Sequence, residues 1–178
     1  DLLGLGSNSL RKIACDSDFR MDIGALKKAI AHDRKQGFVP FIVIGTAGSV
    51  NVGAIDNLSV LAEIARHEKL WFHVDGAFGA TAILSKHLGE RLAGLEQADS
   101  VAFDFHKWLH VNYDAGCVMI RSQTAHLQAF AGRPEYLTGK KQGLAAGSPW
   151  PVDYGPELSR GFRALKIWAH LLEHGVDK

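Results

Sequence analysis

The sequence predicts an α/β fold in which a mostly parallel sheet is flanked by helices. Short apolar runs that suit buried strands alternate with amphipathic stretches, and the units recur about every thirty residues, which is the spacing of strand–helix–strand crossovers. The 178 residues are enough for a domain with a core, and contents of 47% hydrophobic and 22% charged residues are typical of folded chains.

The apolar runs are interpreted as strands because their short continuous apolar character suits burial on both faces. They are residues 10–14, 38–44, 70–74, 100–105 and 116–120. Stretches of helical length separate the middle runs, which predicts parallel neighbours. Between Lys107 and Gly116 there is no room for a crossover helix, so the last strand is expected to run antiparallel to the strand before it.

Helical periodicity predicts the segments that cover the sheet. They are residues 23–35 after a cap at Asp22, a helix starting at Asp56, residues 80–95 with a break near Gly89, residues 122–130 and residues 157–174. Apolar side chains of the last segment are expected to face a core: Leu158, Phe162, Leu165, Trp168 and Leu172. Residues 132–149 show little periodicity, and a loop of this length is usually functional or disordered.

Composition narrows the class of protein. The net charge of +1 gives no electrostatic argument for binding nucleic acid or an anionic membrane, and no apolar run has the length of a membrane span. Cys15 and Cys117 have neither metal-type nor disulfide-type spacing, so we expect free thiols in the cytoplasm and no metal site. Because the chain runs from Asp1, without a methionine, to Lys178 just after a helix, we expect a fragment of a longer polypeptide.

Polar and ionisable residues follow three consecutive strands. Thr46 follows the first and Asp75 the second, while Asp104, His106 and Lys107 lie at the end of the third. Ligands of open parallel sheets bind beyond the carboxyl ends of the strands, so these groups are expected to converge. Taken singly, each has an ordinary interpretation as a cap, turn or surface residue. Their shared placement is what indicates a site.

These residue types suit the chemistry of pyridoxal 5'-phosphate (PLP). Desolvation favours the neutral, nucleophilic amine of a buried lysine, and PLP enzymes need such a lysine together with a carboxylate at the pyridine nitrogen. Lys107 and Asp75 are placed for these two roles. A small residue, Ala77, would let a flat ring approach the backbone, Thr46 could donate to cofactor or substrate, and His106 could reach the phosphate.

Several segments together resemble the group II PLP-dependent amino-acid decarboxylases, which include the aromatic-amino-acid, histidine and glutamate enzymes. In chain order they are Gly45–Ser49 with Asp56–Asn57, His73–Ala77, Ala98–Ser100 leading to His106–Trp108, Val111–Asp114 and Ser159–Lys166. The tryptophan after the lysine is closer to the aromatic and histidine branch. The resemblance spans the chain and implies the large domain of the PLP-dependent transferase-like fold (fold type I).

The resemblance implies roles for matching positions. Lys107 would form the Schiff base with PLP, Asp75 would pair with the pyridinium nitrogen, and Ala77 would pack against the ring. Thr46 would lie beside the cofactor, and His106 near its phosphate.

The resemblance also implies a site shared between two subunits of a homodimer. Tyr136 would lie on a mobile lid loop, residues 132–149, and help to protonate the substrate carbon after CO2 leaves, reaching into the partner subunit's site. Ser159 would line the site from the other subunit. Residues 1–155 would form part of the PLP-binding large domain, and residues 156–178 a helix leading toward a C-terminal small domain that the chain does not contain.

The sequence departs from the family pattern in three respects. Asp104 stands where close relatives often have asparagine, and a carboxylate there would repel phosphate unless it is oriented away or bonded elsewhere. Gly161 replaces a common arginine. The family's ring-stacking histidine and phosphate loop lie upstream of Asp1.

The predicted function is α-decarboxylation of an L-amino acid to the amine and CO2, with the amino acid itself undetermined. One alternative is another PLP enzyme of the same fold, such as a carbon–carbon lyase or an aminotransferase, against which Tyr136 and Trp108 argue. Another is a catalytically incomplete chain that serves as a dimer partner, which Asp104 and the missing upstream residues motivate.

Overall fold

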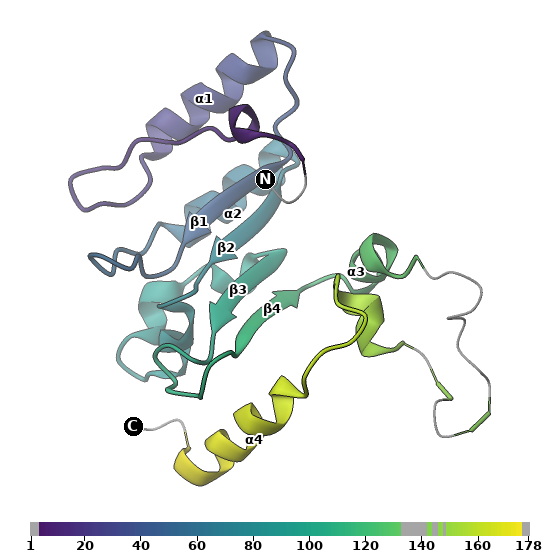
Figure 1. Ribbon diagram of the computed structural model, residues 1–178. Coiled ribbons are helices and arrows are strands. Elements are labelled where there is room, and N and C mark those ends of the chain that lie inside the picture. The colour runs from purple at the N-terminus through teal and green to yellow at the C-terminus, as the bar shows by residue number, and fades with distance from the viewer. Residues whose placement is uncertain (1–3, 133–141, 144–145, 148, 176–178) are drawn as a thin grey trace.

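A four-stranded mixed sheet forms the centre of the computed structural model, which describes residues 4–132, 142–143, 146–147 and 149–175 (Figure 1). The strands lie in chain order: β1 (Ile42–Thr46), β2 (Trp71–Asp75), β3 (Ser100–Asp104) and β4 (Gly116–Ile120). β1, β2 and β3 run parallel, and β4 pairs antiparallel with β3. The predicted mixed sheet and the reversal after Lys107 are confirmed.

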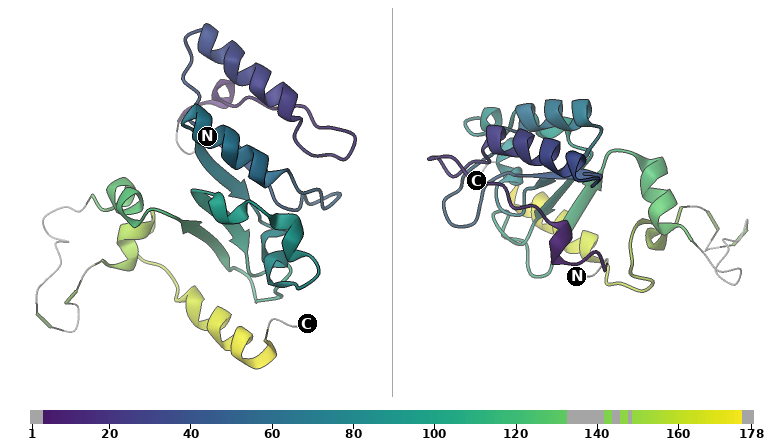
Figure 2. Two further views of the ribbon diagram at one scale, coloured as in Figure 1. Left: turned by 180° about the vertical axis from the view of Figure 1, so that it is seen from behind. Right: turned by 90° about the horizontal axis from the view of Figure 1, so that it is seen from above.

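Two helices, α1 (Ile23–Lys35) and α2 (Leu58–Glu68), lie on one side of the sheet (Figure 2). The bounds of α1 match the prediction, and the carboxylate of Asp22 caps it by accepting a hydrogen bond from the Ala25 N–H. The core lies between these helices and the strands and includes Leu26, Ile30, Val43, Leu58, Leu61, Phe72 and Val74. Apolar burial between layers therefore fixes this half of the molecule.

The expected strands near the N-terminus need correction. Residues 10–14 form no strand; the nearest pairing is an isolated bridge between Cys15 and Met21. The run 38–44 enters the sheet only at Ile42, and Phe38, Val39 and Phe41 are exposed. Apolar character alone does not make a strand, because a strand also needs a neighbour for its backbone hydrogen bonds.

The expected helix over residues 80–95 is also wrong in type. Three short 3-10 helices replace it: η2 (Ala80–Leu84), η3 (Gly89–Leu92) and η4 (Leu95–Gln97). Gly94 has φ of 99°, and a Cβ there would lie 2.3 Å from the backbone nitrogen of Ser59. The backbone conformation of Gly94 and its close approach to the start of α2 therefore separate η3 from η4.

The C-terminal part extends away from the core (Figure 1). Helix α3 (Gln123–Phe130) packs on the 3-10 helix η6 (Pro151–Tyr154), with His126 Nε2 2.9 Å from the Tyr154 carbonyl oxygen. The last helix, α4 (Arg163–His174), starts six residues later than the predicted 157. No helix within the described ranges is long and apolar enough to cross a membrane.

The expectation that the apolar side chains of the last helix face a core is wrong for this chain. The side chains in question, Leu158, Phe162, Leu165, Trp168 and Leu172, are all exposed. Their helical spacing is amphipathic, but within the described residues α4 contacts the loop between β3 and β4, through Arg163 and Asp114, and not a second layer of helices. Periodicity reports a face that is suited to burial and does not supply the partner.

The second face of the sheet is open. Ile42 and Ile44 of β1 and Val118 of β4 are exposed, whereas Val43 and Phe72, which point to the α1–α2 side, are buried. β1 and β2 thus have one closed and one open face.

Candidate active site

The carboxyl ends of the three parallel strands carry the residues that the sequence singled out. β1 ends at Thr46, β2 at Asp75 and β3 at Asp104. Thr46 and Asp75 are paired in register, and Asp75 is paired with Ala102, two residues before Asp104. We call this edge, with the adjoining Ala77, His106 and Lys107, the strand-end site. The three parallel strands therefore end at the same edge of the sheet, as expected, and the functional roles of these residues stay predictions.

Thr46 is fixed through its backbone by a buried carboxylate. Asp56 Oδ2 accepts a hydrogen bond from the Thr46 N–H at 2.7 Å, and Asp56 Oδ1 accepts one from the Met21 N–H at 2.6 Å. The prediction that Asp56 starts a helix is therefore wrong. Asn57 caps α2 by accepting from the Val60 N–H, and Asp56 instead joins the loop after β1 to the strand.

Asp75 presents an exposed carboxylate at the end of β2. Its Oδ1 accepts a hydrogen bond from the Ala77 N–H at 3.1 Å, and its backbone carbonyl accepts one from the Ala47 N–H at 2.8 Å. The loops that follow β1 and β2 pack tightly behind it, because a Cβ on Gly79 would lie 2.6 Å from the Ala47 carbonyl oxygen. The carboxylate is thus held by main-chain contacts.

A hydrogen-bonded group on the open face lies beside Asp75. The buried Ser100 Oγ accepts from Trp71 Nε1 at 2.7 Å and lies 2.8 Å from His73 Nδ1. An indole nitrogen only donates, and the Ser100 hydroxyl, with one proton and two lone pairs, can donate to or accept from His73 Nδ1 according to the tautomer of the imidazole. Burial lowers the pKa of His73, and the nearby Asp75 carboxylate and the Ser100 contact offset part of that shift.

Lys107 lies in the turn that follows β3, with its amine held by two groups. Its Nζ lies 2.6 Å from Asp104 Oδ2 and 4.2 Å from the centroid of the Phe78 ring. Its side chain is 22% exposed, as is that of Asp104. Asp104 would repel a nearby phosphate unless its carboxylate is turned away or bonded to another group. The ion pair with Lys107 meets the second of these conditions.

His106 is oriented by the backbone of the neighbouring loop. Its Nδ1 accepts a hydrogen bond from the Ala115 N–H at 2.9 Å, and its ring centroid lies 3.9 Å from that of Tyr113. A backbone N–H can only donate, so Nδ1 carries no proton and the ring proton lies on Nε2. Nε2 is 3.9 Å from Asp104 Oδ2, which is beyond hydrogen-bond distance, and so remains a donor for another group.

The two remaining predicted residues do not contribute to the strand-end site as described. Tyr136 lies outside the described residues. Ser159 is exposed in the connection before α4, and no hydrogen bond within the described residues ties it to the strand ends. The segments 111–114 and 159–166 do meet, since Arg163 Nε lies 2.9 Å from Asp114 Oδ2. That contact lowers the pKa of Asp114.

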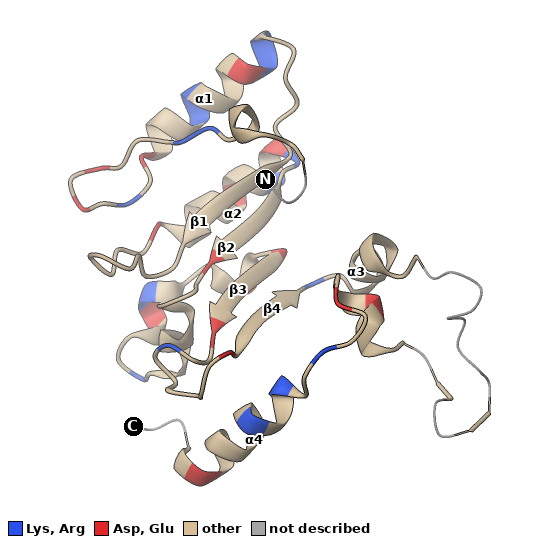
Figure 3. Cartoon of the chain, in the orientation of Figure 1, with Lys and Arg blue, Asp and Glu red and all other residues tan. Residues whose placement is uncertain are grey.

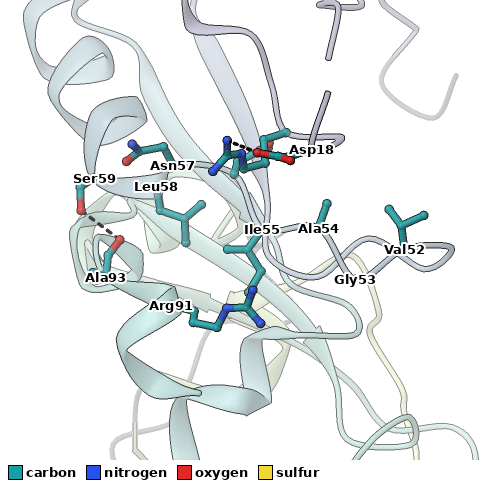
Figure 4. A pocket seen from close by; sticks show the side chains of 12 residues that line it. Asp18, Val52, Gly53, Ala54, Ile55, Asn57, Leu58, Ser59, Arg91 and Ala93 are labelled. Carbon is teal, nitrogen blue, oxygen red and sulfur yellow. Dashed lines mark hydrogen bonds and ion pairs between the residues drawn. The ribbon is translucent and has the colours of Figure 1, made fainter. Parts of the chain in front are cut away.

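A hollow of about 600 Å³ lies at the start of α2 (Figure 4). Its lining includes Ile55, Leu58 and Arg91 but none of the strand-end residues. Arg20, which also lines it, is paired with Asp18 at 2.7 Å. Among the described residues no group of three or more His, Cys, Asp or Glu side chains could hold a metal ion. The chemistry is therefore best sought at the strand ends.

Sequence reasoning missed several residues that shape the site. Phe78 contacts the Lys107 amine, Asp56 holds Thr46, and Ser100 joins Trp71 to His73. Asp56 and Ser100 lie within segments that resemble the family. The resemblance therefore marked both residues but did not indicate what either one contacts. Phe78 gave no signal, because nothing local in the sequence shows which ring will lie over a given amine.

Charged residues lie at the strand ends and at the start of α4 (Figure 3). Asp75 and Asp104 end neighbouring strands, and Arg163 and Lys166 of α4 face Asp114 in the loop after β3. Asp104 thus has a cation from the following turn, Lys107, and Asp114 has the cations of α4.

Comparisons with known proteins agree with this geometry. A family model described as "Pyridoxal-dependent decarboxylase conserved domain" matches residues 3–178. The chain is 41% identical over 175 residues to an aromatic-L-amino-acid decarboxylase of Bacillus atrophaeus, covering 98% of the chain and 36% of that protein. It is 37% identical over 173 residues to a histidine decarboxylase of Drosophila melanogaster, covering 97% of the chain and 20% of that protein.

Solved structures show the same fold. A crystal structure of Oryza sativa TDC with PLP and tryptamine matches with a TM-score of 0.87 and 28% identity, covering 98% of this chain and 36% of that one. A Rhodiola rosea 4-hydroxyphenylacetaldehyde synthase matches with a TM-score of 0.82 and 32% identity, covering 98% and 35%. The chain thus spans about a third or less of the relatives it matches. Its near-complete match to the family model shows that the chain belongs to the pyridoxal-dependent decarboxylase family.

Proposed function

We propose that the protein catalyses PLP-dependent α-decarboxylation of an L-amino acid, releasing the amine and CO2. The observation that carries the proposal is the strand-end site of a pyridoxal-dependent decarboxylase chain, where the amine of Lys107 and the exposed carboxylate of Asp75 follow neighbouring strands. These are the two protein groups that PLP chemistry requires.

The residues present fit the cofactor. Asp75 is exposed at the sheet edge while its Oδ1 is anchored to the Ala77 N–H, so its other oxygen can face a pyridine nitrogen. Lys107 would carry the cofactor covalently, His106 Nε2 would donate toward its phosphate, and Thr46 and Ala77 would lie beside its ring. When bound, PLP supplies an electron-accepting ring for the electron pair that remains after CO2 departs.

The chain's own residues contribute position and charge. Asp75 keeps a negative charge at the end of β2, where it favours protonation of a ring nitrogen. The neutral His73 beside it does not compete for that charge as a cation would. Asp56 holds the Thr46 backbone, so the β1 edge is fixed when ligands bind. Such preorganised groups act on developing charge without reorganising during the reaction.

The decisive variant is Lys107→Ala in the full-length protein. Loss of the covalent attachment point should abolish the visible absorbance of bound PLP and lower CO2 release by about 10³-fold or more. Lys86→Ala is the matched control, because Lys86 is an exposed lysine outside the strand-end site. If Lys107→Ala retains the CO2 release of the control, the proposal is wrong.

We further propose that Tyr136 returns a proton to the substrate carbon after CO2 leaves. The resemblance supports this role. The relatives also include both decarboxylases and a 4-hydroxyphenylacetaldehyde synthase, so related chains yield amine or aldehyde products. Tyr136→Phe should leave PLP absorbance unchanged and lower the yield of amine, with aldehyde appearing among the products. An unchanged amine yield would remove Tyr136 from the mechanism.

The assembly and domain assignments are also proposals. Homodimer formation, with Ser159 lining a partner's site, is supported by the resemblance and by the exposed apolar face of α4. Assignment of residues 1–155 to the large domain, with residues 156–178 leading toward a small domain, rests on the resemblance. A cytoplasmic location is supported by the free thiols Cys15 and Cys117.

A further inference from the structure

We propose that the ion pair between Asp114 and Arg163 orients His106 toward the cofactor phosphate. The pair ties the connection between β3 and β4 to the first residue of α4. The inference rests on the proposed function, because the direction of the imidazole matters to the reaction only if a phosphate group binds beside it. Asp114 and Arg163 are positioning residues in this scheme, since they would act on the cofactor only through His106.

The connection between β3 and β4 folds into a compact loop around His106. The Phe105 N–H donates a hydrogen bond to the Ala115 carbonyl oxygen at 2.9 Å, and the Ala115 N–H donates one to His106 Nδ1 at 2.9 Å. The ring centroid of Tyr113 lies 3.9 Å from that of the imidazole. Ala115 is fully buried, and the His106 side chain is only 9% exposed. The imidazole is therefore held by the two residues on either side of Asp114.

Asp114 is the residue through which this loop contacts α4. Its Oδ2 accepts a hydrogen bond from Arg163 Nε at 2.9 Å, and Lys166 Nζ lies 3.9 Å from its Oδ1. The same guanidinium contacts Glu157 Oε2 through Nη1 at 3.2 Å, so two of its nitrogens fix its direction. The hydrogen bond between the two side chains lowers the pKa of Asp114 and raises that of Arg163, which keeps the pair ionised at neutral pH.

The covalent chain transmits this contact to the imidazole. Asp114 follows the residue whose ring covers His106 and precedes the residue whose amide bonds to Nδ1. A displacement of Asp114 relative to α4 therefore moves both groups that hold the ring, and Nε2 changes direction with the ring. The side chains of Asp114 and Arg163 are 60% and 34% exposed, so the pair contributes little to the free energy of unfolding. Its effect is expected on the orientation of His106.

The test is backbone amide hydrogen exchange of the full-length protein, followed by mass spectrometry of peptides that resolve Ala115. Arg163→Gln removes the charge, and exchange of the Ala115 N–H should rise about two- to fivefold, the range that an exposed ion pair implies. Arg163→Lys keeps the charge and should restore most of the protection. Arg34→Gln is the matched control, because it breaks an exposed pair with Glu68 at the ends of α1 and α2, and it should leave Ala115 unchanged.

A double-mutant cycle separates coupling from two independent effects. Asp114→Asn should speed Ala115 exchange by a similar factor, and the double variant with Arg163→Gln should exchange no faster than either single variant. Raising the salt concentration should speed this exchange in the unsubstituted protein but not in the double variant. Amides of β1 and β2 should keep their rates throughout, because the change is local and is not unfolding.

The functional consequence is measured as the affinity for PLP, by titration of the cofactor-free protein and its absorbance. The dissociation constant should rise about two- to fivefold in Arg163→Gln, in proportion to the gain in exchange, and return toward the original value in Arg163→Lys. If Arg163→Gln does not fold, Asp114→Asn provides the same comparison from the other side of the pair.

The proposal is overturned if Ala115 exchanges no faster in Arg163→Gln than in Arg34→Gln, or if the effects of Arg163→Gln and Asp114→Asn add in full. It is also overturned if exchange rises while the affinity for PLP is unchanged, since the loop would then move without consequence for His106. Failure of the proposed function would be seen separately, as decarboxylation that survives Lys107→Ala.

Discussion

The two faces of the sheet, built from the same strands, differ in what they contribute. On the closed face Phe72 and Val74 are almost fully buried under α1 and α2. On the open face the alternate residues of β2 are Trp71, His73 and Asp75, with polar contacts to Ser100 and Ala77. The alternation of side chains along a strand thus separates stability from chemistry in a single element. Substitutions on the two faces should therefore have different effects.

The largest expected effect on stability lies on the closed face. Phe72→Ala removes a side chain that is 1% exposed and should lower the free energy of unfolding by about 3–5 kcal/mol. Ile44→Ala, on the open face of the adjacent strand, should cost about 1 kcal/mol because Ile44 is 42% exposed. Urea denaturation of the full-length variants measures both. Equal losses would mean that the open face is covered in the whole protein.

The turn at Gly76, directly after β2, should be the next most sensitive to substitution in its effect on the free energy of unfolding. A Cβ at Gly76 would lie 2.3 Å from Ala80 Cβ, so Gly76→Ala forces the start of η2 to move. Overpacking of this kind costs about 1–3 kcal/mol. Gly161→Ala is the control, since a Cβ there meets nothing within 4 Å. A Gly76→Ala protein with unchanged thermal unfolding would contradict the packing described for this turn.

Ser100→Ala tests the polar group of the open face. The change leaves Trp71 Nε1 and His73 Nδ1 without their shared partner and should cost about 1–2 kcal/mol, with a shift in the NMR signals of both nitrogens. Ser9→Ala, which loses only an exposed contact to the Leu5 carbonyl, should be nearly neutral. Unshifted Trp71 and His73 resonances would show that no such network exists in solution.

The smallest effect concerns pH. Because burial lowers the pKa of His73 below its unfolded value of 6.5, the unfolded chain binds more protons than the folded one below that pH. The contribution of His73 is therefore constant above pH 6.5, falls as the pH drops through 6.5 toward the folded pKa, and then levels off. His73→Gln should flatten the dependence of the unfolding free energy on pH below 6.5. A slope identical to that of the unsubstituted protein would rule out this linkage.

Local patterns were sufficient where neighbouring residues decide the outcome. The bounds of α1 follow from its spacing and from the cap at Asp22, and the antiparallel return of β4 follows from a connection too short for a helix. The helix predicted over residues 80–95 is replaced by short 3-10 helices, and at its end the close approach of the Gly94 and Ser59 backbones overrides helical spacing. The strand predicted over residues 10–14 is wrong because no neighbouring strand among the described residues completes its backbone hydrogen bonds.

The sequence by itself determined the α/β alternation, the polar strand ends at Thr46, Asp75 and Asp104, and the resemblance that the family match confirmed. These depend on short-range spacing and on residue type. Only the tertiary structure decided that Ser100 joins Trp71 and His73, residues 27 to 29 positions away, and that Phe78 and Asp104 both hold the Lys107 amine. Such contacts depend on strand register and on the course of loops, which no local pattern specifies.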